Sequence, residues 1–205
     1  MIAIIDYGAG NLRSVQKAFE FIGNEAIITS NRDEILSADH IILPGVGSFG
    51  DCMSSIRLNK LDDCIYDVIE SKKPFLGICL GLQLLFEESE ESPNIKGLGI
   101  LKGKIVKIPQ NENIKIPHMG WNSLTFPKKS PIFEGIDENS FVYFVHSYYM
   151  QPDDASIIAA ECEYSGTLPV ALSKDNIHAT QFHPEKSGKV GLKILENFAK
   201  LGGDC

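Results

Sequence analysis

The sequence lacks the features that mark several special classes of protein. It has no block of basic residues, and its net charge of −8 argues against nucleic acids and anionic membrane surfaces as partners. No apolar run approaches the roughly 18 residues that span a bilayer, and Asp6 ends the first apolar run too early for a signal peptide. The five cysteines form no metal-like pairing, and their odd number indicates a reducing compartment. We expect a cytoplasmic protein without a metal ion or other cofactor.

The remaining composition is that of an ordinary globular protein. The chain has 205 residues, of which 43% are hydrophobic and 22% are charged. No repeat, low-complexity segment or linker rich in Pro, Gly or Ser divides it. We therefore expect a single domain over residues 1–205.

The first hundred residues alternate between short apolar strands and helices. Strands are predicted at residues 1–6, 25–30, 40–45 and 74–78, and helices at 12–22, 31–38, 52–73 and 80–88. Strands that are apolar on both faces and alternate with helices are typical of a parallel sheet covered on both sides. The second half reads as strands and turns, including a hairpin at Asp175-Asn176, until a last helix over 187–202. We predict a doubly wound, flavodoxin-like α/β sheet, mostly parallel, with an antiparallel extension.

The stretch "GICLGLQLLF" at residues 77–86 places Cys79 between a strand and a helix. A side chain at such a turn projects from the carboxyl edge of the sheet, where open α/β folds bind ligands. Gly77 and Gly81 flank it at the spacing of a nucleophile elbow, and a helix N-terminus favours a thiolate. A buried thiol at a tight turn explains this motif equally well.

The other cysteines have contexts that favour different roles. Cys64 and Cys162 share apolar faces of a predicted helix and strand, which indicates core positions. Cys52 begins a predicted helix near a glycine loop, where a side chain can be exposed but no basic residue accompanies it, and Cys205 ends the chain.

The segment "QFHPEKSG" offers a base for Cys79. Pro184 favours an extended conformation at His183, and residues two apart on an extended chain point to the same side. Glu185 can therefore orient the His183 imidazole, as the acid of a catalytic triad does. A polar loop explains this short motif when it is read alone, whereas its combination with a cysteine elbow favours catalysis.

An oxyanion site is the third requirement of such chemistry. The backbone N–H of Leu80 follows the nucleophile and is a donor in elbow architectures. The run "PGVGSFG" at 44–50 follows a strand and offers a second amide at Gly47. A glycine-rich turn is the alternative, and a phosphate loop is disfavoured because the GK[ST] ending is absent.

Together these motifs resemble the class I, or triad, glutamine amidotransferases. Within that family, the segments "DYGAGNLRSV", "PGVGSFGDCM", "HMGWN", "YFVHSYY" and "FHPEKSG" resemble the glutaminase subunits of imidazole glycerol phosphate synthase. The run "PGVG" departs from the PGGP-like loop of other subgroups and fits this one. These segments follow in order over nearly the whole chain.

The resemblance implies hydrolysis of L-glutamine and delivery of ammonia to a separate cyclase subunit of (β/α)8-barrel form. That partner would make imidazole glycerol phosphate and aminoimidazole carboxamide ribotide in histidine biosynthesis. The implied catalytic residues are Cys79, His183 and Glu185, and the implied glutamine contacts are Gln83, Glu91, Ser147 and Tyr148. By itself, the acidic run that Glu91 ends reads as a solvated helix end.

The resemblance also implies a partner interface that includes Asn11, Tyr143, His146 and Lys186. Trp121 is either a core residue or an aromatic anchor in that interface. Two rival functions share the fold, namely another cysteine hydrolase and a binding module without catalysis. Gln83 favours glutamine over other hydrolase substrates, and the intact set of Cys79, His183 and Glu185 argues against the binding module.

Overall fold

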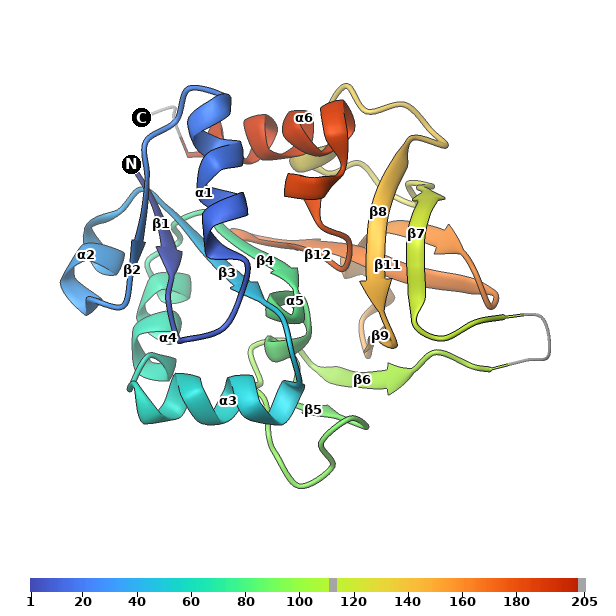
Figure 1. Ribbon diagram of the computed structural model, residues 1–205, viewed down its shortest axis with the longest axis horizontal. Helices are drawn as coiled ribbons and strands as arrows, with labels where there is room; N and C mark the ends of the chain where they lie inside the picture. Colours follow the sequence, from blue (N-terminus) through green and yellow to red (C-terminus); the bar gives the residue numbers. More distant parts are fainter. Residues whose placement is uncertain (111–113, 203–205) are drawn as a thin grey trace.

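A seven-stranded sheet forms the centre of the computed structural model, which describes residues 1–110 and 114–202 (Figure 1). The strand order is β10-β11-β12-β4-β3-β1-β2. Five neighbouring strands are parallel, and the other two extend the sheet antiparallel. The parallel strands are β1 (Ile2–Ile5), β2 (Ala26–Thr29), β3 (His40–Gly45), β4 (Phe75–Cys79) and β12 (Ile177–Thr180), and the extension consists of β10 (Ile158–Glu163) and β11 (Thr167–Lys174).

Helices cover both faces of this sheet because its strands are apolar on both sides. In β1, Ile2 and Ile4 belong to one buried cluster, whereas Ala3 and Ile5 belong to the other. The first face packs against α1 (Leu12–Phe21) and α6 (Gly188–Ala199). The opposite face packs against α2 (Arg32–Ser37), α3 (Phe49–Leu58), α4 (Asp62–Glu70) and α5 (Leu80–Leu84). The parallel strands follow the order 2-1-3-4-5 of the flavodoxin-like fold, so the predicted fold class is confirmed.

Smaller sheets, built mostly from the second half of the chain, flank the carboxyl edge of the central sheet. One contains β5 (Glu88–Ser89), β6 (Gly103–Lys107) and β9 (Tyr148–Pro152), and the other pairs β7 (His118–Ser123) with β8 (Phe141–His146). Short 3-10 helices lie at Pro131–Phe133, Ala155–Ile157 and Pro184–Lys186. β8 and β9 are separate strands on either side of Ser147, because β8 pairs with β7 while β9 pairs with β6.

The helix predicted over residues 52–73 is in fact two helices, α3 and α4. Lys60 adopts a left-handed conformation with φ of 55°, which ends the first helix one turn before the second begins. Ile56 and Ile65 are nevertheless buried in the same cluster. The apolar spacing thus continues across the break, which is why the pattern did not reveal it.

The helix predicted over residues 80–88 is also shorter than expected and ends at Leu84. The backbone carbonyls of residues 84, 85 and 86 accept hydrogen bonds from the amides of residues 98, 101 and 99. These contacts with a later segment replace helical hydrogen bonds, so the chain turns out of the helix toward β5. The predicted hairpin at Asp175 is confirmed, since Lys174 pairs with Ile177.

The outer strand β10 is irregular. Its register with β11 shifts between Ile158 and Ala160 and again between Ala160 and Glu161. Glu161 also exchanges backbone hydrogen bonds with Thr125, outside the sheet. The strand is therefore bent and partly occupied along its free side.

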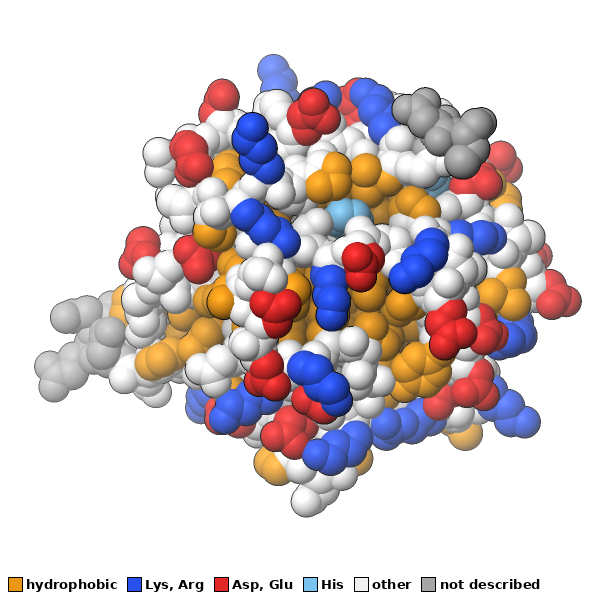
Figure 2. Space-filling view, turned by 180° about the vertical axis from the view of Figure 1, so that it is seen from behind, with side chains coloured by type: hydrophobic (Ala, Val, Ile, Leu, Met, Phe, Trp, Pro, Cys, Tyr) orange, Lys and Arg blue, Asp and Glu red, His pale blue; other side chains and the backbone are white. Residues whose placement is uncertain are grey.

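The face turned away from the view of Figure 1 carries acidic and basic side chains that are interspersed with hydrophobic ones (Figure 2). Within residues 1–110 and 114–202, no helix is long and apolar enough to cross a membrane.

Candidate active site

Cys79 lies where β4 ends and α5 begins, as the elbow motif predicts. Its backbone has φ of 55° and ψ of −108°, a combination that L-residues other than glycine rarely adopt. Such strain persists only where the surrounding structure enforces it, and it is typical of functional positions. The turn directs a cysteine to the edge of the sheet at a cost in backbone energy.

The two flanking glycines are required by close packing. A Cβ atom on Gly81 would overlap the backbone oxygen of Leu43 in β3. A Cβ on Gly77 would lie 2.9 Å from the carbonyl carbon and oxygen of Gly81. Because backbone atoms block both positions, the elbow depends on glycine at each of them.

A cavity of about 320 Å³ brings most of the predicted site residues together. Its lining comes from the elbow, the loop after β3, the β8–β9 junction and the end of β12. The lining residues are Val46, Gly47, Cys79, Leu80, Gln83, Glu91, Pro117, Val145, His146, Ser147, Tyr148 and His183.

His183 and Glu185 form a buried pair beside this cavity. His183 Nδ1 lies 2.9 Å from Glu185 Oε1, and the two side chains are 3% and 1% exposed. Burial opposes a charge on the imidazole, but the neighbouring Cys79 sulfur and the Glu185 carboxylate raise the pKa of His183 to about 9. Among the described residues, nothing hydrogen-bonds to His183 Nε2. The imidazole is thus held at one nitrogen and leaves the other available to a reacting group.

The loop after β3 begins beside the elbow, since Gly45, the last residue of β3, pairs with Cys79. Tyr7 donates a hydrogen bond from its hydroxyl to the Pro44 carbonyl (2.8 Å), and the Cys52 thiol lies 3.5 Å from the Val46 carbonyl. Gly47 has φ of 104° and lines the cavity. Cys52 is buried rather than partly exposed, because it packs beneath this loop with Tyr7 and Phe49, and burial raises the pKa of its thiol.

Cys64 and Cys162 are buried core residues, as predicted. Cys205 lies outside the described residues.

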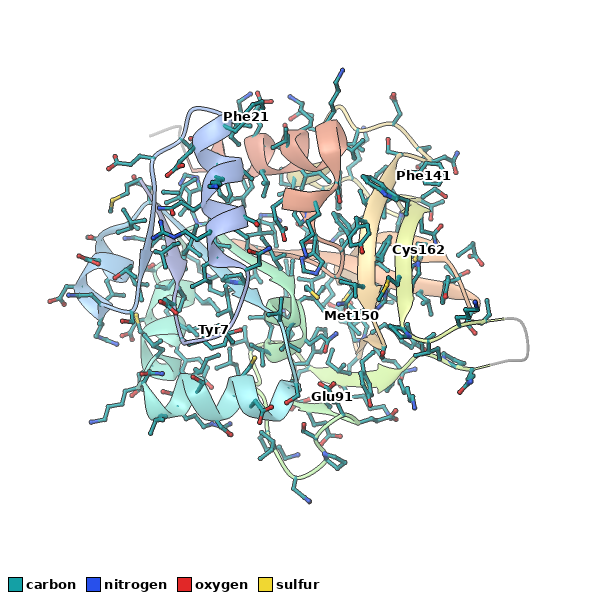
Figure 3. All side chains as sticks on the ribbon, in the orientation of Figure 1. Tyr7, Phe21, Glu91, Phe141, Met150 and Cys162 are labelled. Carbon is teal, nitrogen blue, oxygen red and sulfur yellow. The ribbon has the colours of Figure 1, made fainter. Side chains whose placement is uncertain are left out.

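Glu91 does not lie at a helix C-terminus, as its sequence context suggested. Its Oε2 accepts a hydrogen bond from the backbone N–H of Phe49 (2.7 Å), the first residue of α3. Figure 3 shows Glu91 beside the start of that helix. A carboxylate at a helix N-terminus is favourable, so this charge is well placed while it also lines the cavity.

Gln83 and Tyr148 meet on one side of the cavity. Gln83 Nε2 donates to the Tyr148 carbonyl (3.2 Å) and to Gln181 Oε1 (3.0 Å). Gln181 in turn lies with its Nε2 3.7 Å from the Cys79 sulfur. The sequence analysis missed Gln181, although it stands two residues before His183 in the same motif.

The residues expected at a partner interface differ in exposure. Trp121 is 56% exposed and packs edge-on against Tyr143, its neighbour across the β7–β8 pair. Asn11 and Lys186 are also exposed. His146 is buried in the cavity wall, where its Nδ1 lies 2.9 Å from the Tyr148 carbonyl. Of the five, His146 alone lines the cavity that contains Cys79.

His146 also contacts a second buried histidine. Its Nε2 lies 2.9 Å from Nδ1 of His118, whose ring stacks on Tyr164. Burial lowers the pKa of His118 to about 4 and that of His146 to about 3. Both rings are therefore neutral near pH 7, in contrast to His183.

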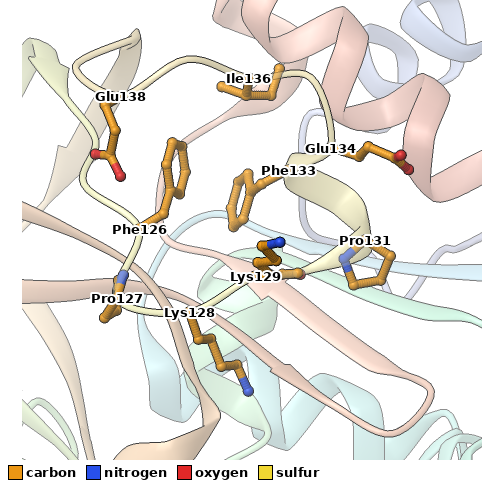
Figure 4. Close-up of a pocket in the computed structure, with 10 residues that line it drawn as sticks. Phe126, Pro127, Lys128, Lys129, Pro131, Phe133, Glu134, Ile136 and Glu138 are labelled. Carbon is orange, nitrogen blue, oxygen red and sulfur yellow. The ribbon is translucent and has the colours of Figure 1, made fainter.

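A larger cavity of about 700 Å³ lies in the connection between β7 and β8 (Figure 4). Phe126 and Phe133 meet there, with ring centroids 5.0 Å apart, and Lys129 and Glu138 stand at its rim. Its lining contains neither cysteine nor histidine, so the smaller cavity holds the candidate chemistry. No group of three or more His, Cys, Asp or Glu side chains in residues 1–110 and 114–202 is placed to hold a metal ion.

The arrangement around Cys79 supports nucleophilic catalysis on a carbonyl group. A thiol nucleophile, a buried imidazole with an acidic partner and backbone amides at two adjacent strand ends are the components of acyl transfer. None of the described residues that line the cavity is Lys or Arg, the side chains that commonly hold a phosphate group.

Comparisons with known proteins identify the family of this chain. The family model for "Glutamine amidotransferase class-I" matches residues 3–201. The imidazole glycerol phosphate synthase subunit HisH of Methanocaldococcus jannaschii is 56% identical over 201 residues, which cover 98% of this chain and all of that protein. HisH of Aquifex aeolicus is 52% identical over 198 residues, with 96% and 95% coverage.

Solved structures share the fold at lower identity. A crystal structure titled as a glutamine amidotransferase matches all of both chains with a TM-score of 0.77 at 18% identity. A chain in the structure of PurLQS from Thermotoga maritima also gives 0.77, at 21% identity and 97% coverage of both chains. From the family model and the full-length relatives it follows that the chain belongs to the class I glutamine amidotransferases.

Proposed function

We propose that this chain is the glutaminase subunit of an imidazole glycerol phosphate synthase and that residues 1–205 act as one amidotransferase domain. The full-length identity of 56% to a HisH subunit carries the proposal. The cavity that joins Cys79, His183 and Gln83 supports it chemically. We propose the cytoplasm as its compartment.

In the proposed reaction, His183 Nε2 takes the proton of the Cys79 thiol, the sulfur attacks the side-chain carbonyl carbon of glutamine, and the carbonyl electron pair moves to oxygen. Backbone N–H groups of Leu80 and Gly47 stabilise this oxyanion. The intermediate collapses as the C–N bond breaks, and His183 gives its proton to the departing amine, which leaves as ammonia. A γ-glutamyl thioester with Cys79 remains.

The second half-reaction returns the enzyme to its starting state. His183 Nε2, which has no partner among the described residues, takes a proton from water as the water oxygen attacks the thioester carbonyl. The C–S bond breaks, glutamate leaves, and the proton on His183 returns to the sulfur. Glu185 keeps Nδ1 of His183 protonated and fixes the ring throughout.

The remaining cavity groups would hold the amino-acid end of glutamine. The Glu91 carboxylate has the charge to bind an α-ammonium group, and the backbone of Ser147 and Tyr148 borders the same space. Gln83 donates both hydrogens of its amide within the protein, which leaves its Oε1 to accept a hydrogen bond from the substrate.

The test separates glutamine use from ammonia use. We expect Cys79→Ala, assembled with the cyclase subunit, to lose glutamine-dependent product formation and to keep product formation from ammonium salts. Cys64→Ala is the matched control, since it removes a buried thiol from α4. Retention of glutamine-dependent turnover by Cys79→Ala would refute the proposal.

The proposed partner is a cyclase subunit of (β/α)8-barrel form, docked at the carboxyl edge through Asn11, Trp121, Tyr143 and Lys186, whereas the buried His146 is left out of this surface. Exposed apolar side chains support a docking surface there, since Met119 and Trp121 of β7 are 62% and 56% exposed. We expect Trp121→Ala to weaken the complex at least tenfold in calorimetric titration. Phe21→Ala, which removes an even more exposed aromatic side chain from α1, should bind as the unaltered chain does. Unchanged affinity of Trp121→Ala would remove Trp121 from the interface.

A further inference from the structure

Gln181 connects two residues of the candidate site without lining the cavity itself. It follows β12, and its exposed fraction is 0%. Its backbone N–H is held by the Val170 carbonyl (2.8 Å), so β11 fixes its position. Its side chain lies between Gln83 and the Cys79 sulfur.

The direction of these hydrogen bonds follows from one fixed acceptor. The Tyr148 carbonyl can only accept, so the Gln83 group 3.2 Å away must be its NH₂. That NH₂ also reaches Gln181, which must therefore present its oxygen to Gln83 (3.0 Å). The NH₂ of Gln181 is then left to face the Cys79 sulfur at 3.7 Å. A series of N–H donations thus runs from Gln83 to Gln181 and from Gln181 to the sulfur.

This series of hydrogen bonds has two consequences for chemistry at Cys79. An N–H donor favours a thiolate over a thiol, because hydrogen bonds to the charged form stabilise that form. The same hydrogen bonds fix which end of the Gln83 amide faces the cavity. If Gln181 were absent, the Gln83 amide would lose one of its two acceptors and its orientation would be less restricted.

We propose that Gln181 is a positioning residue that holds the Cys79 sulfur by N–H donation and fixes the orientation of the Gln83 amide. The inference rests on the proposed function for its effect on turnover. Its effect on the thiol does not depend on that function.

The experiment measures alkylation of Cys79 by iodoacetamide as a function of pH, in the full chain, with the modified peptide identified by mass spectrometry. Gln181→Met keeps the length of the side chain and removes both hydrogen-bonding groups. We expect the pH midpoint of Cys79 alkylation to rise by about one unit. Gln16→Met is the control, since Gln16 donates to the Ala26 carbonyl on the edge strand β2.

Glutamine turnover in the complex gives a second readout. We expect Gln181→Met to lower kcat about ten- to a hundredfold, as loss of a hydrogen bond to a charged group would, and to raise KM for glutamine. A shifted alkylation midpoint without any glutaminase activity in the unaltered chain would uphold the inference and refute the proposed function.

Gln181→Glu keeps the proposal testable where the methionine variant does not fold. A protonated carboxyl group can donate to sulfur and accept from Gln83, whereas an ionised one can only accept. We expect near-normal reactivity of Cys79 at low pH and loss of that reactivity as the introduced carboxyl ionises. A pH profile of Cys79 alkylation that matches the unaltered chain in either variant would overturn the proposal.

Discussion

Two histidines from one segment show how the interior of the sheet differs from its carboxyl edge. His178 lies within β12 and His183 lies just beyond the strand, and both are buried. His178 Nδ1 pairs with the Ser173 hydroxyl, and burial lowers the pKa of His178 to about 4. At His183, the sulfur and the carboxylate overcome burial and raise the pKa to about 9.

The comparison shows that burial alone does not decide the charge of a histidine. In the interior, a neutral imidazole meets a neutral hydroxyl. At the edge, a strained cysteine and a charged pair lie together, held by the close packing of glycines beneath them. The predictions below test each part of this difference.

The largest expected effect comes from disturbing the packing below the edge. Gly81→Ala should lower the free energy of unfolding by about 3 kcal/mol, because the new methyl group overlaps the backbone oxygen of Leu43 and overpacking of this kind costs 1–3 kcal/mol or more. Urea denaturation measures the change. Gly47→Ala is the control, since nothing lies within 4 Å of its Cβ position and only its positive φ opposes alanine. Equal losses in both variants would contradict the role assigned to packing.

His178 in the interior should make the free energy of unfolding depend on pH, by about 2 kcal/mol. Unfolded His178 binds a proton below about pH 6.5, whereas the folded protein resists protonation until about pH 4. The free energy of unfolding should therefore fall as pH drops from 7 to 5, and His178 accounts for about 2 kcal/mol of that fall. His178→Gln should lose correspondingly less stability over this interval in urea titrations. An unchanged slope would show that His178 is already charged in the folded state.

His183 should have the opposite effect, since its contribution makes the free energy of unfolding fall as pH rises above neutral. Its raised pKa means that its contribution to stability is complete below about pH 6.5 and disappears as pH rises through about 9. His183→Gln should therefore show a smaller loss of stability between pH 7 and 9.5 than the unaltered chain. A steeper loss in the variant would reverse the proposed electrostatics of the edge.

The smallest effect concerns backbone strain at the elbow. Cys79→Gly should raise the free energy of unfolding by about 1 kcal/mol relative to Cys79→Ala, because glycine tolerates a φ of 55° and alanine does not. Both variants lack the thiol, so the comparison isolates the conformation. Thermal and urea unfolding measure it. A less stable glycine variant would mean that the elbow is relaxed in the native state.

Much of the fold could be predicted because its signals are local. The apolar strands ending at Ile5, Gly45 and Cys79 alternate with helical patterns, and that alternation alone indicates a doubly wound sheet. The break at Lys60 could not be predicted, because the apolar spacing runs through it unchanged. The early end of α5 depends on carbonyls of residues 84–86 that bond a segment more than ten residues later.

The candidate site likewise contains some residues that local motifs predict and others that only long-range contacts bring into place. Cys79, His183 and Glu185 stand in short motifs whose geometry is set within a few residues, and the structure places all three at one edge. Glu91 at the start of α3 and Gln181 beside the sulfur depend on contacts between residues 42 and 102 positions apart. No local pattern encodes such contacts.

The bent outer strand β10 has a consequence for how molecules of this chain meet one another. A straight, unpaired strand offers a row of free backbone groups to the same strand of a second molecule, and such pairing can continue into aggregates. The register shifts around Ala160 and the hydrogen bonds between Glu161 and Thr125 interrupt that row. The shape of β10 thus disfavours edge-to-edge self-association through this side of the sheet at high concentration.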